Sequence, residues 1–379
     1  MNVRILSLVV LTTIVSSCQQ VVINNPNPDY ASNVDSIRIS PNGCSDKTIF
    51  VGKQIGNRPL ASQLVNLEGV DRYYMLDDEM LYVFNWEDGQ LCDSIMLKHS
   101  GKMNDYSGFN VISEDSILLY NYSQKTIQYV NRNGEVFKSL ELNKIKSLQT
   151  DIESLNHSRI QQMHDCIIAS GATLGDTRET KISERPVSVA INVSNAATQP
   201  IMQYPKIYRD ANWGGVYMNT VYHTSSDGRY VFYSFPIEHN VYKLDLQNGK
   251  ISTFSMGSKY CKVISSSKSD FLGEFLDKNK RTEYYLHEHS YAMIMYDEYR
   301  KHIIRIAEHP ADGMNEDGTF AKPFSIIISD MNGKILSESP MFENAQDLDL
   351  YNMHITKQGL AIALIQKNED IIVFKCYKL

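Results

Sequence analysis

Short runs of alternating hydrophobic and polar residues, separated by tight turns, fill most of this chain. The clearest set lies between residues 217 and 254, where four runs rich in β-branched and aromatic residues follow one another. Two of the turns between them are Asp227-Gly228 and Asn248-Gly249, and such pairs favour the positive φ angles of hairpin turns. The pattern predicts a four-stranded antiparallel meander with strands at 217–223, 230–235, 241–245 and 251–254.

The same four-strand unit recurs along the chain. Two copies are predicted at 63–97 and 109–142, and their turn glycines, Gly89 and Gly134, are one propeller-blade length apart. A third copy covers 149–204 and opens with a segment, 149–159, that is compatible with a short helix. After the 217–254 unit comes a polar insertion at 265–283, in which we expect a helix at 271–276, and then a fifth copy at 291–338.

The last unit, at 351–377, has only three strands. A ring of blades leaves no free sheet edge only if another segment supplies the missing strand, and the N-terminal runs 36–40 and 48–51 are not otherwise used. We therefore predict an all-β fold, a β-propeller of six four-stranded blades closed by an N-terminal strand. The range of blade numbers compatible with the sequence is five to seven.

The first residues have the pattern of an export signal. Arg4 precedes an apolar segment at 5–14, and small residues then lead to Cys18. This arrangement resembles a bacterial lipoprotein signal, in which Cys18 becomes the acylated N-terminus; an ordinary secretory signal with an incidental cysteine is the alternative. We predict a signal peptide at 1–17, a lipidated tether at 18–35 and a propeller domain at 36–379.

A lipid on Cys18 would make the membrane a partner of this protein. In some bacteria, an acidic run directly after the acylated cysteine resembles a signal for export to the cell surface. The residues after Cys18 lack such a run. We therefore expect a cell-envelope protein on the periplasm-facing side of the outer membrane.

The charge and the cysteine spacing of the chain exclude further classes of partner and site. The net charge is −7 and no dense run of Lys and Arg occurs, which argues against nucleic acid as a partner. Apart from Cys18, five cysteines are widely spaced without a C-x-x-C pair, so neither a disulfide framework nor a zinc site is predicted. We expect no cofactor.

With this layout, the chain resembles the β-propeller lipoproteins of Bacteroides-type bacteria, especially the family called domain of unknown function 4221. The segments that carry the resemblance are 73–82, 116–120, 233–236 with 241–242, and 296–300 with 304–305. The resemblance extends over essentially the whole mature chain. It implies the propeller fold and the envelope location, and it implies no activity.

Few residues suggest chemistry. The common catalytic and nucleotide-binding motifs are absent, and His287 and His289 are the nearest approach to a metal site, although no third ligand is identifiable. Arg305 lies in an apolar strand, where it either lines the channel and binds a carboxylate or forms an internal contact with an acidic group or a tyrosine.

Aromatic residues in connections between blades are the other candidates. Trp213 precedes Gly214-Gly215 and follows Arg209, and two interpretations of this loop carry equal weight: the ring stacks a sugar or a peptide, or it packs over the adjacent blade. Tyr296 is a further candidate, as one of the many tyrosines that a binding role would use.

We expect a non-catalytic binding or scaffold protein whose partner is a glycan, a peptide or an envelope protein. A propeller hydrolase or lactonase is the alternative, since one architecture hosts both classes. Such an enzyme needs carboxylates, imidazoles or a cation at the channel mouth, whereas the acidic pairs Asp77-Asp78 and Glu369-Asp370 fall in predicted turns. The sequence leaves open whether the protein is an enzyme.

Overall fold

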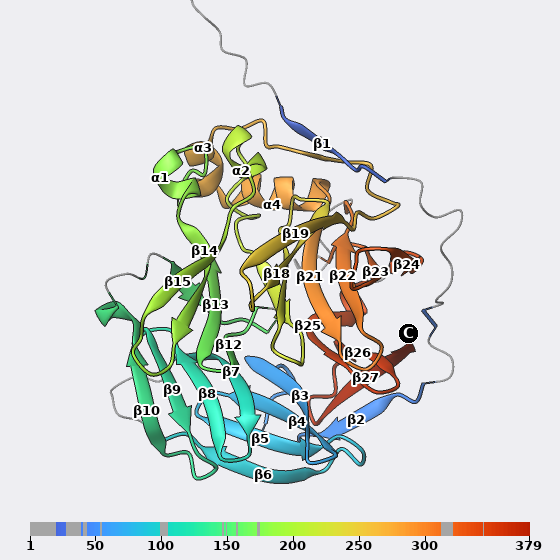
Figure 1. The fold of residues 1–379 in the computed structure, drawn as a ribbon. Coiled ribbons are helices and arrows are strands. Elements are labelled where there is room, and N and C mark those ends of the chain that lie inside the picture. Colours follow the sequence, from blue (N-terminus) through green and yellow to red (C-terminus); the bar gives the residue numbers. More distant parts are fainter. Residues whose placement is uncertain are drawn as a thin grey trace, which may run out of the picture.

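The computed structural model describes residues 20–27, 39–40, 44–53, 55–98, 105–145, 148, 150–156, 158–172, 175–311, 321–343 and 345–379. Within them, six antiparallel sheets are arranged around a central axis, so the chain is a six-bladed β-propeller (Figure 1). The prediction of an all-β propeller is confirmed. No helix of the described residues is long and apolar enough to cross a membrane.

Each blade begins with its innermost strand, and the sheets follow the chain order. The strands of the first three blades are β3 Ala61–Leu67, β4 Val70–Asp77, β5 Met80–Asn85 and β6 Leu91–Met96; β7 Tyr106–Ser113, β8 Ser116–Asn121, β9 Thr126–Val130 and β10 Val136–Glu141; β11 Asp151–Glu153, β12 Gln161–Met163, β13 Cys166–Ala172, β14 Pro186–Asn192 and β15 Thr198–Gln203. Those of the last three are β16 Val221–Thr224, β17 Tyr230–Ser234, β18 Asn240–Asp245 and β19 Lys250–Ser255; β21 Ser290–Asp297, β22 His302–Glu308, β23 Phe324–Asp330 and β24 Ile335–Glu338; β25 Leu348–Ile355, β26 Gly359–Leu364, β27 Ile371–Lys378 and β2 Lys47–Phe50.

The outer strand of the last blade comes from the N-terminal part of the chain. β2 pairs antiparallel with β27, with Ile49 opposite Ile372, and Ile49 is fully buried. Of the two runs considered from the sequence, the one at 48–51 thus lies in the last sheet. The other, 36–40, falls mostly outside the described residues, and its last residue, Ser40, forms an isolated bridge with Lys378.

The turn glycines predicted from the sequence also join neighbouring blades. Gly89 and Gly134 have φ angles of 71° and 73°, which L-residues rarely adopt. A Cβ atom on Gly89 would lie 1.9 Å from the Thr48 carbonyl oxygen of β2, and one on Gly134 would lie 1.8 Å from that of Met96 in β6. Each turn therefore touches the outer strand of the preceding blade so closely that only glycine fits.

The structure differs from the prediction in three places. The segment 149–159 holds β11 rather than a helix, because Asp151–Glu153 pair with β13. The insertion is more helical than expected, with α3 Phe271–Leu276 followed by α4 Lys278–His287, while short helices α1 Thr180–Ser183 and α2 Ile207–Asp210 lie in earlier connections. The described residues also include the 3₁₀ turns η2 Leu142–Lys144 and η3 Ala345–Asp347.

The third difference concerns the segment expected to be a tether. Part of it, β1 Val22–Asn24, pairs with β20 Val263–Ser265 in the insertion. It therefore lies on the folded domain at the end that carries the helices (Figure 1).

The hydrophobic core lies between the blades rather than at one centre. Between the first two blades, for example, Leu76 and Leu81 pack with Phe109 and Ile117, and all four are at most 2 % exposed. Side chains on the sheet faces thus meet across the blade interfaces, which leaves the axis free for a channel.

Candidate functional site

The innermost strands of all six blades surround a cavity of about 630 Å³ at one end of the axis. These strands run in the same direction, so the cavity lies at their carboxyl ends, beside the turns that follow them. We call it the Arg159 cavity. Its lining combines amide, tyrosine, methionine and aliphatic side chains.

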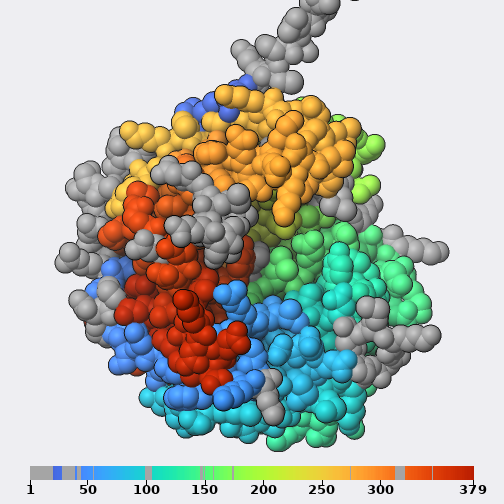
Figure 2. All heavy atoms as spheres, turned by 180° about the vertical axis from the view of Figure 1, so that it is seen from behind, coloured from blue at the N-terminus to red at the C-terminus, as the bar shows by residue number. Residues whose placement is uncertain are grey.

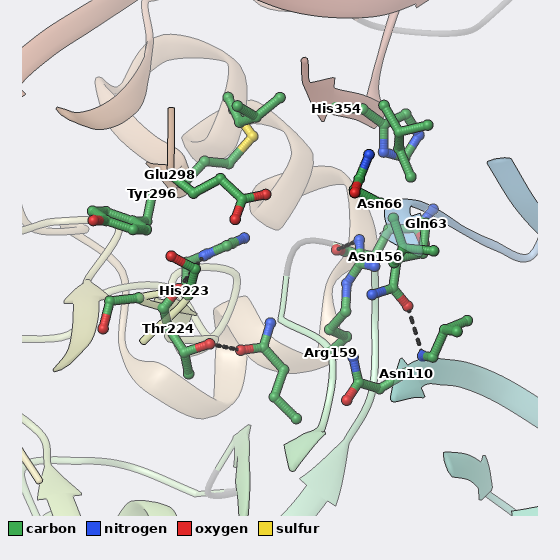
Figure 3. A pocket seen from close by; sticks show the side chains of 18 of the residues that line it. Gln63, Asn66, Asn110, Asn156, Arg159, His223, Thr224, Tyr296, Glu298 and His354 are labelled. Carbon is green, nitrogen blue, oxygen red and sulfur yellow. Dashed lines mark hydrogen bonds between the residues drawn. The ribbon is translucent and has the colours of Figure 1, made fainter. Parts of the chain in front are cut away.

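Arg159 extends into this cavity just before β12 (Figure 3). Its guanidinium donates one hydrogen bond to the residues that the structure describes, from Nη2 to the Asn156 carbonyl oxygen at 3.2 Å. The channel walls desolvate the guanidinium and lower its pKa to about 10, so it remains charged at neutral pH. Among the described residues Arg159 has no ion pair, which leaves a cation with free donors facing the cavity.

Amide side chains surround this arginine. Figure 3 shows Arg159 among Asn156, Gln63 and Asn110, which come from three neighbouring blades. Gln162 Oε1, which also lines the cavity, is buried without a hydrogen-bond partner in the described structure. This side of the cavity therefore offers both donors and acceptors to a polar molecule.

Two histidines flank the arginine. Burial lowers the pKa of His223 to about 4 and that of His354 to about 3, and the charge of Arg159 adds to the lowering of both. His223 Nδ1 lies 2.9 Å from the Thr224 carbonyl oxygen, and His354 Nε2 lies 2.9 Å from Asn352 Oδ1. Both imidazoles are therefore neutral at pH 7.

A belt of hydrogen-bonded polar residues lies at the base of the Arg159 cavity. Ser62 donates its backbone N–H to Asn156 Oδ1 at 2.7 Å and its hydroxyl to Asn352 Oδ1 at 2.8 Å. Asn156 lines both this cavity and the next one along the axis. The belt holds Asn156, and with it the carbonyl that receives Arg159, in a fixed place.

The opposite wall of the cavity is aromatic and apolar. Tyr296 stacks on Phe232 with ring centroids 5.8 Å apart, and Met293 and Met295 line the same strand. The exposed Glu298 follows them at the rim, across the cavity from Arg159 in Figure 3. Methionine side chains adapt to different shapes, so this wall suits an apolar or aromatic portion of a ligand.

The other end of the channel opens beside α4. A cavity of about 420 Å³ lies there, lined by Tyr285, Glu308 and Tyr351 among others, and we call it the helix-side cavity. Glu308 accepts hydrogen bonds from Tyr285 Oη at 2.9 Å and Ser290 Oγ at 2.8 Å, and the buried Lys322 Nζ lies 4.0 Å away. Burial lowers the pKa of Lys322 to about 8, but its neighbours already satisfy it.

Of the residues predicted from the sequence, Tyr296 lies in the Arg159 cavity and Arg305 does not. Arg305 is fully buried, and its guanidinium stacks on Tyr291 at 3.5 Å from the ring centroid. It donates to Ser234 Oγ and to four backbone carbonyls, those of Phe235, Glu238, His239 and Met256. The structure thus shows the internal tyrosine contact, and the channel position is wrong because the guanidinium donors are used inside the protein.

The loop around Trp213 is also placed differently from the prediction. Trp213 is 1 % exposed and donates Nε1 to the Ile207 carbonyl oxygen, so its ring packs inside the protein and has no free face for a ligand. Arg209 lies nearby in α2 and is exposed.

The two histidines considered for metal are not on one strand face. His287 ends α4 and is exposed, whereas His289 lies against His309 with their Nδ1 atoms 3.2 Å apart. Within the described ranges, no three His, Cys, Asp or Glu residues are placed to hold a metal ion. The five cysteines after residue 43 are free thiols, and Cys18 lies outside the described residues.

Sequence reasoning missed Arg159 and the two flanking histidines. Arg159 ends the segment for which a helix is expected, and nothing in its local sequence distinguishes an arginine that faces a channel from one that faces water. One signal could have identified Arg159, namely its position just before a short inner strand. Once the number of blades is known, a residue at that position is expected to lie near the axis.

Comparisons with known proteins agree with this fold. No curated protein matches the chain. A crystal structure of a DUF4221 family member from Bacteroides vulgatus superposes with a TM-score of 0.75 at 16% identity, covering 96% of this chain and 99% of that one. A protein from Bacteroides fragilis that is described as exported gives a TM-score of 0.54 at 13% identity, covering 91% and 97%.

At these identities the two structures establish the shared fold and nothing about activity. The sequence model of a family described as domain of unknown function (DUF4221) matches residues 40–340, which is most of the chain. The chain therefore belongs to the DUF4221 family.

Proposed function

We propose that this protein is a lipid-anchored, non-catalytic binding protein of the cell envelope, and that its ligand is a small organic carboxylate held in the Arg159 cavity. The export signal before Cys18 and the similarity to a Bacteroides fragilis protein described as exported support the envelope location. Attachment to the periplasm-facing side of the outer membrane is part of this proposal.

The observation that carries the binding role is the unpaired charge of Arg159. Leaving a cation in a desolvated channel costs free energy unless a partner compensates it, and the described residues supply none. A planar guanidinium with free donors matches a carboxylate, which it binds through two parallel hydrogen bonds. We therefore assign the carboxylate of the ligand to Arg159.

The other residues that line the Arg159 cavity indicate the chemistry of the rest of the ligand. The amides of Gln63, Asn110 and Gln162 suit peptide groups or sugar hydroxyls, and the wall of Met293 and Tyr296 suits an apolar portion. A peptide with a free C-terminus and a sugar acid both carry this chemistry. These fit the peptide and glycan partners expected from the sequence.

A hydrolase or lactonase is the second candidate considered. Its channel would bring several carboxylates or imidazoles together, whereas His223 and His354 lie on different sides of the cavity and are held by Thr224 and Asn352. The arrangement supports binding through Arg159 better than it supports activation of water.

Calorimetric titration with matched probes tests the binding role. The probes are a short apolar peptide with a free C-terminus, the same peptide as its C-terminal amide, glucuronate and glucose. We expect the wild-type protein to bind one of the two carboxylates at least ten-fold more tightly than its neutral counterpart, because each charge-assisted pair contributes well over 1 kcal/mol. The probe that binds, peptide or sugar acid, shows which class of molecule supplies the carboxylate.

The variants Arg159→Gln and Arg159→Lys provide the matched comparison. The glutamine variant should lose the preference for the carboxylate, while the lysine variant should keep part of it, since lysine retains charge but not the fork geometry. Equal affinity of free and amidated peptide, together with unchanged affinity in Arg159→Gln, would refute the assignment.

A further inference from the structure

The N-terminal segment is fixed to the insertion, and this restricts where a lipid on Cys18 can lie. Gln20 Nε2 donates to the Ser266 carbonyl oxygen at 2.9 Å, and the Val21 backbone N–H donates to Ser266 Oγ at 2.9 Å. Asn25 is buried, with Nδ2 donating to the carbonyl oxygens of Ser258 and Cys261 at 2.8 and 3.0 Å. The segment from Gln20 to Asn25 is therefore part of the folded domain.

Only one residue separates Cys18 from Gln20. An extended chain spans at most about 3.5 Å per residue, so the covalent linkage between Cys18 and Gln20 is at most roughly 7 Å long. A lipid attached there cannot hold the domain at a distance from the bilayer. The surface around β1 and β20 must then be close to the headgroups.

The neighbouring helix exposes apolar side chains on the same end of the molecule. Leu272 and Leu276 of α3 are 65 % and 77 % exposed, and their spacing of four residues places them on one helix face. Phe271 and Phe275 stack with ring centroids 5.4 Å apart and are less exposed, so the two sides of α3 are different. In Figure 2 the yellow-orange segment that includes α3 lies beside the blue residues of β1.

The charge of this region also differs from that of the whole chain. Residues 257–281 contain six Lys and Arg and three Asp and Glu, in a protein whose net charge is −7. Lys268, Lys278 and Lys280 are exposed and flank α3 on both sides. Basic side chains around exposed leucines suit a surface that carries anionic lipid headgroups.

We infer that the surface formed by β1, β20 and α3, called here the membrane face, lies against the lipid bilayer, with Leu272 and Leu276 in contact with acyl chains. This inference rests on the proposed lipidation of Cys18. The helix-side cavity, which Tyr285 of α4 lines, then opens toward the membrane. The Arg159 cavity lies at the opposite end of the axis and opens toward the aqueous compartment.

Fluorescence quenching in nanodiscs tests this orientation with the full lipoprotein. The protein is purified in detergent and reconstituted with phosphatidylethanolamine and phosphatidylglycerol whose acyl chains are brominated, since bromine quenches tryptophan on contact. One variant carries Leu276→Trp and the control carries Phe137→Trp, which is 57 % exposed on β10 in the second blade. The parent protein supplies the background from the buried Trp86 and Trp213.

We expect the added fluorescence of Leu276→Trp to fall by at least half in brominated nanodiscs, and that of Phe137→Trp to remain unchanged. Adding Leu272→Glu to the Leu276→Trp protein should reduce the quenching while the protein stays in the membrane. Absence of quenching at 276 in nanodisc-bound protein overturns the membrane face and favours a protein partner there. A parent protein that does not remain with the nanodiscs, and lacks an acylated N-terminal cysteine by mass spectrometry, instead overturns the lipid anchor.

Discussion

Two arginines, in the third and fifth blades of the propeller, have opposite roles. Arg305 is enclosed, with five hydrogen bonds and a tyrosine ring around its guanidinium, and it connects β22 to the loops of the fourth blade. Within the described part of the chain, the Arg159 guanidinium donates a single hydrogen bond, and it faces a cavity. The number of donors already used distinguishes a structural arginine from one available to a ligand.

Substituting each arginine by methionine should separate these roles. Arg305→Met removes a charged donor from four buried carbonyls, and we expect the free energy of unfolding to fall by roughly 3–5 kcal/mol. Arg159→Met removes one hydrogen bond at the edge of a cavity, so we expect a change below about 1 kcal/mol. Urea unfolding followed by circular dichroism measures both, and similar losses for the two variants would contradict the distinction.

The dependence of ligand affinity on pH follows from the groups around Arg159. Arg159 keeps its charge because its pKa of about 10 lies above neutral pH, and the pKa values of His223 and His354, about 4 and about 3, lie below the range tested. Neither histidine changes charge between roughly pH 5.5 and pH 8. A carboxylate probe should therefore bind with constant affinity over this range in calorimetry. An affinity that weakens as the pH rises through about 6.5 would show that a protonated histidine binds the ligand instead.

At the scale of the elements, the tight turns both end the hairpins and hold adjacent blades together. Gly89 accepts the Phe50 backbone N–H at 2.9 Å through its carbonyl, so the first blade's outer turn contacts β2 of the last blade. Gly249 has a similar φ of 68°, but no atom lies within 4 Å of the position that a Cβ atom would take there. Gly89 and Gly249 therefore share the same backbone conformation and differ in whether a neighbouring strand lies against them.

Alanine at these two positions tests the contact between the first and last blades. Gly249→Ala should cost about 1–2 kcal/mol from its left-handed backbone alone. Gly89→Ala carries the same backbone cost and places its methyl group against the Thr48 carbonyl, so we expect about 1–3 kcal/mol more. Thermal unfolding of both proteins is the measurement, and equal melting temperatures would mean that β2 does not support the ring.

The elements were predictable where local chemistry decides them. Asp-Gly and Asn-Gly turns, such as Asp88-Gly89 and Asn133-Gly134, set the blade length, and β-branched runs set the strands. The docking of β1 was not predictable, since its partner β20 is more than two hundred residues away and neither strand has a strong pattern. Arg159 was missed for the same reason, because a channel exists only after six blades have closed.

At the scale of the whole molecule, the two ends of the channel face different environments if the lipid anchor is present. The helix-side cavity lies beside α4, whose Tyr284 hydroxyl donates to the Ser265 carbonyl oxygen of β20, and the Arg159 cavity lies at the other end. A ligand from the aqueous compartment would meet Arg159 first, since the Arg159 cavity lies at that end and Asn156 lines both cavities. The proposed anchor and the proposed binding site thus occupy opposite ends of one propeller.

The most direct measurement is a crystal structure of the protein soaked with the carboxylate that binds more tightly in calorimetry. We predict density for its carboxylate at about 2.7–2.9 Å from the Arg159 guanidinium nitrogens, with the apolar portion against Met293 and Tyr296. A probe bound elsewhere while the Arg159 cavity holds only water, or an Arg159 paired with a carboxylate of the protein itself, would contradict the assignment of Arg159 as the binding site.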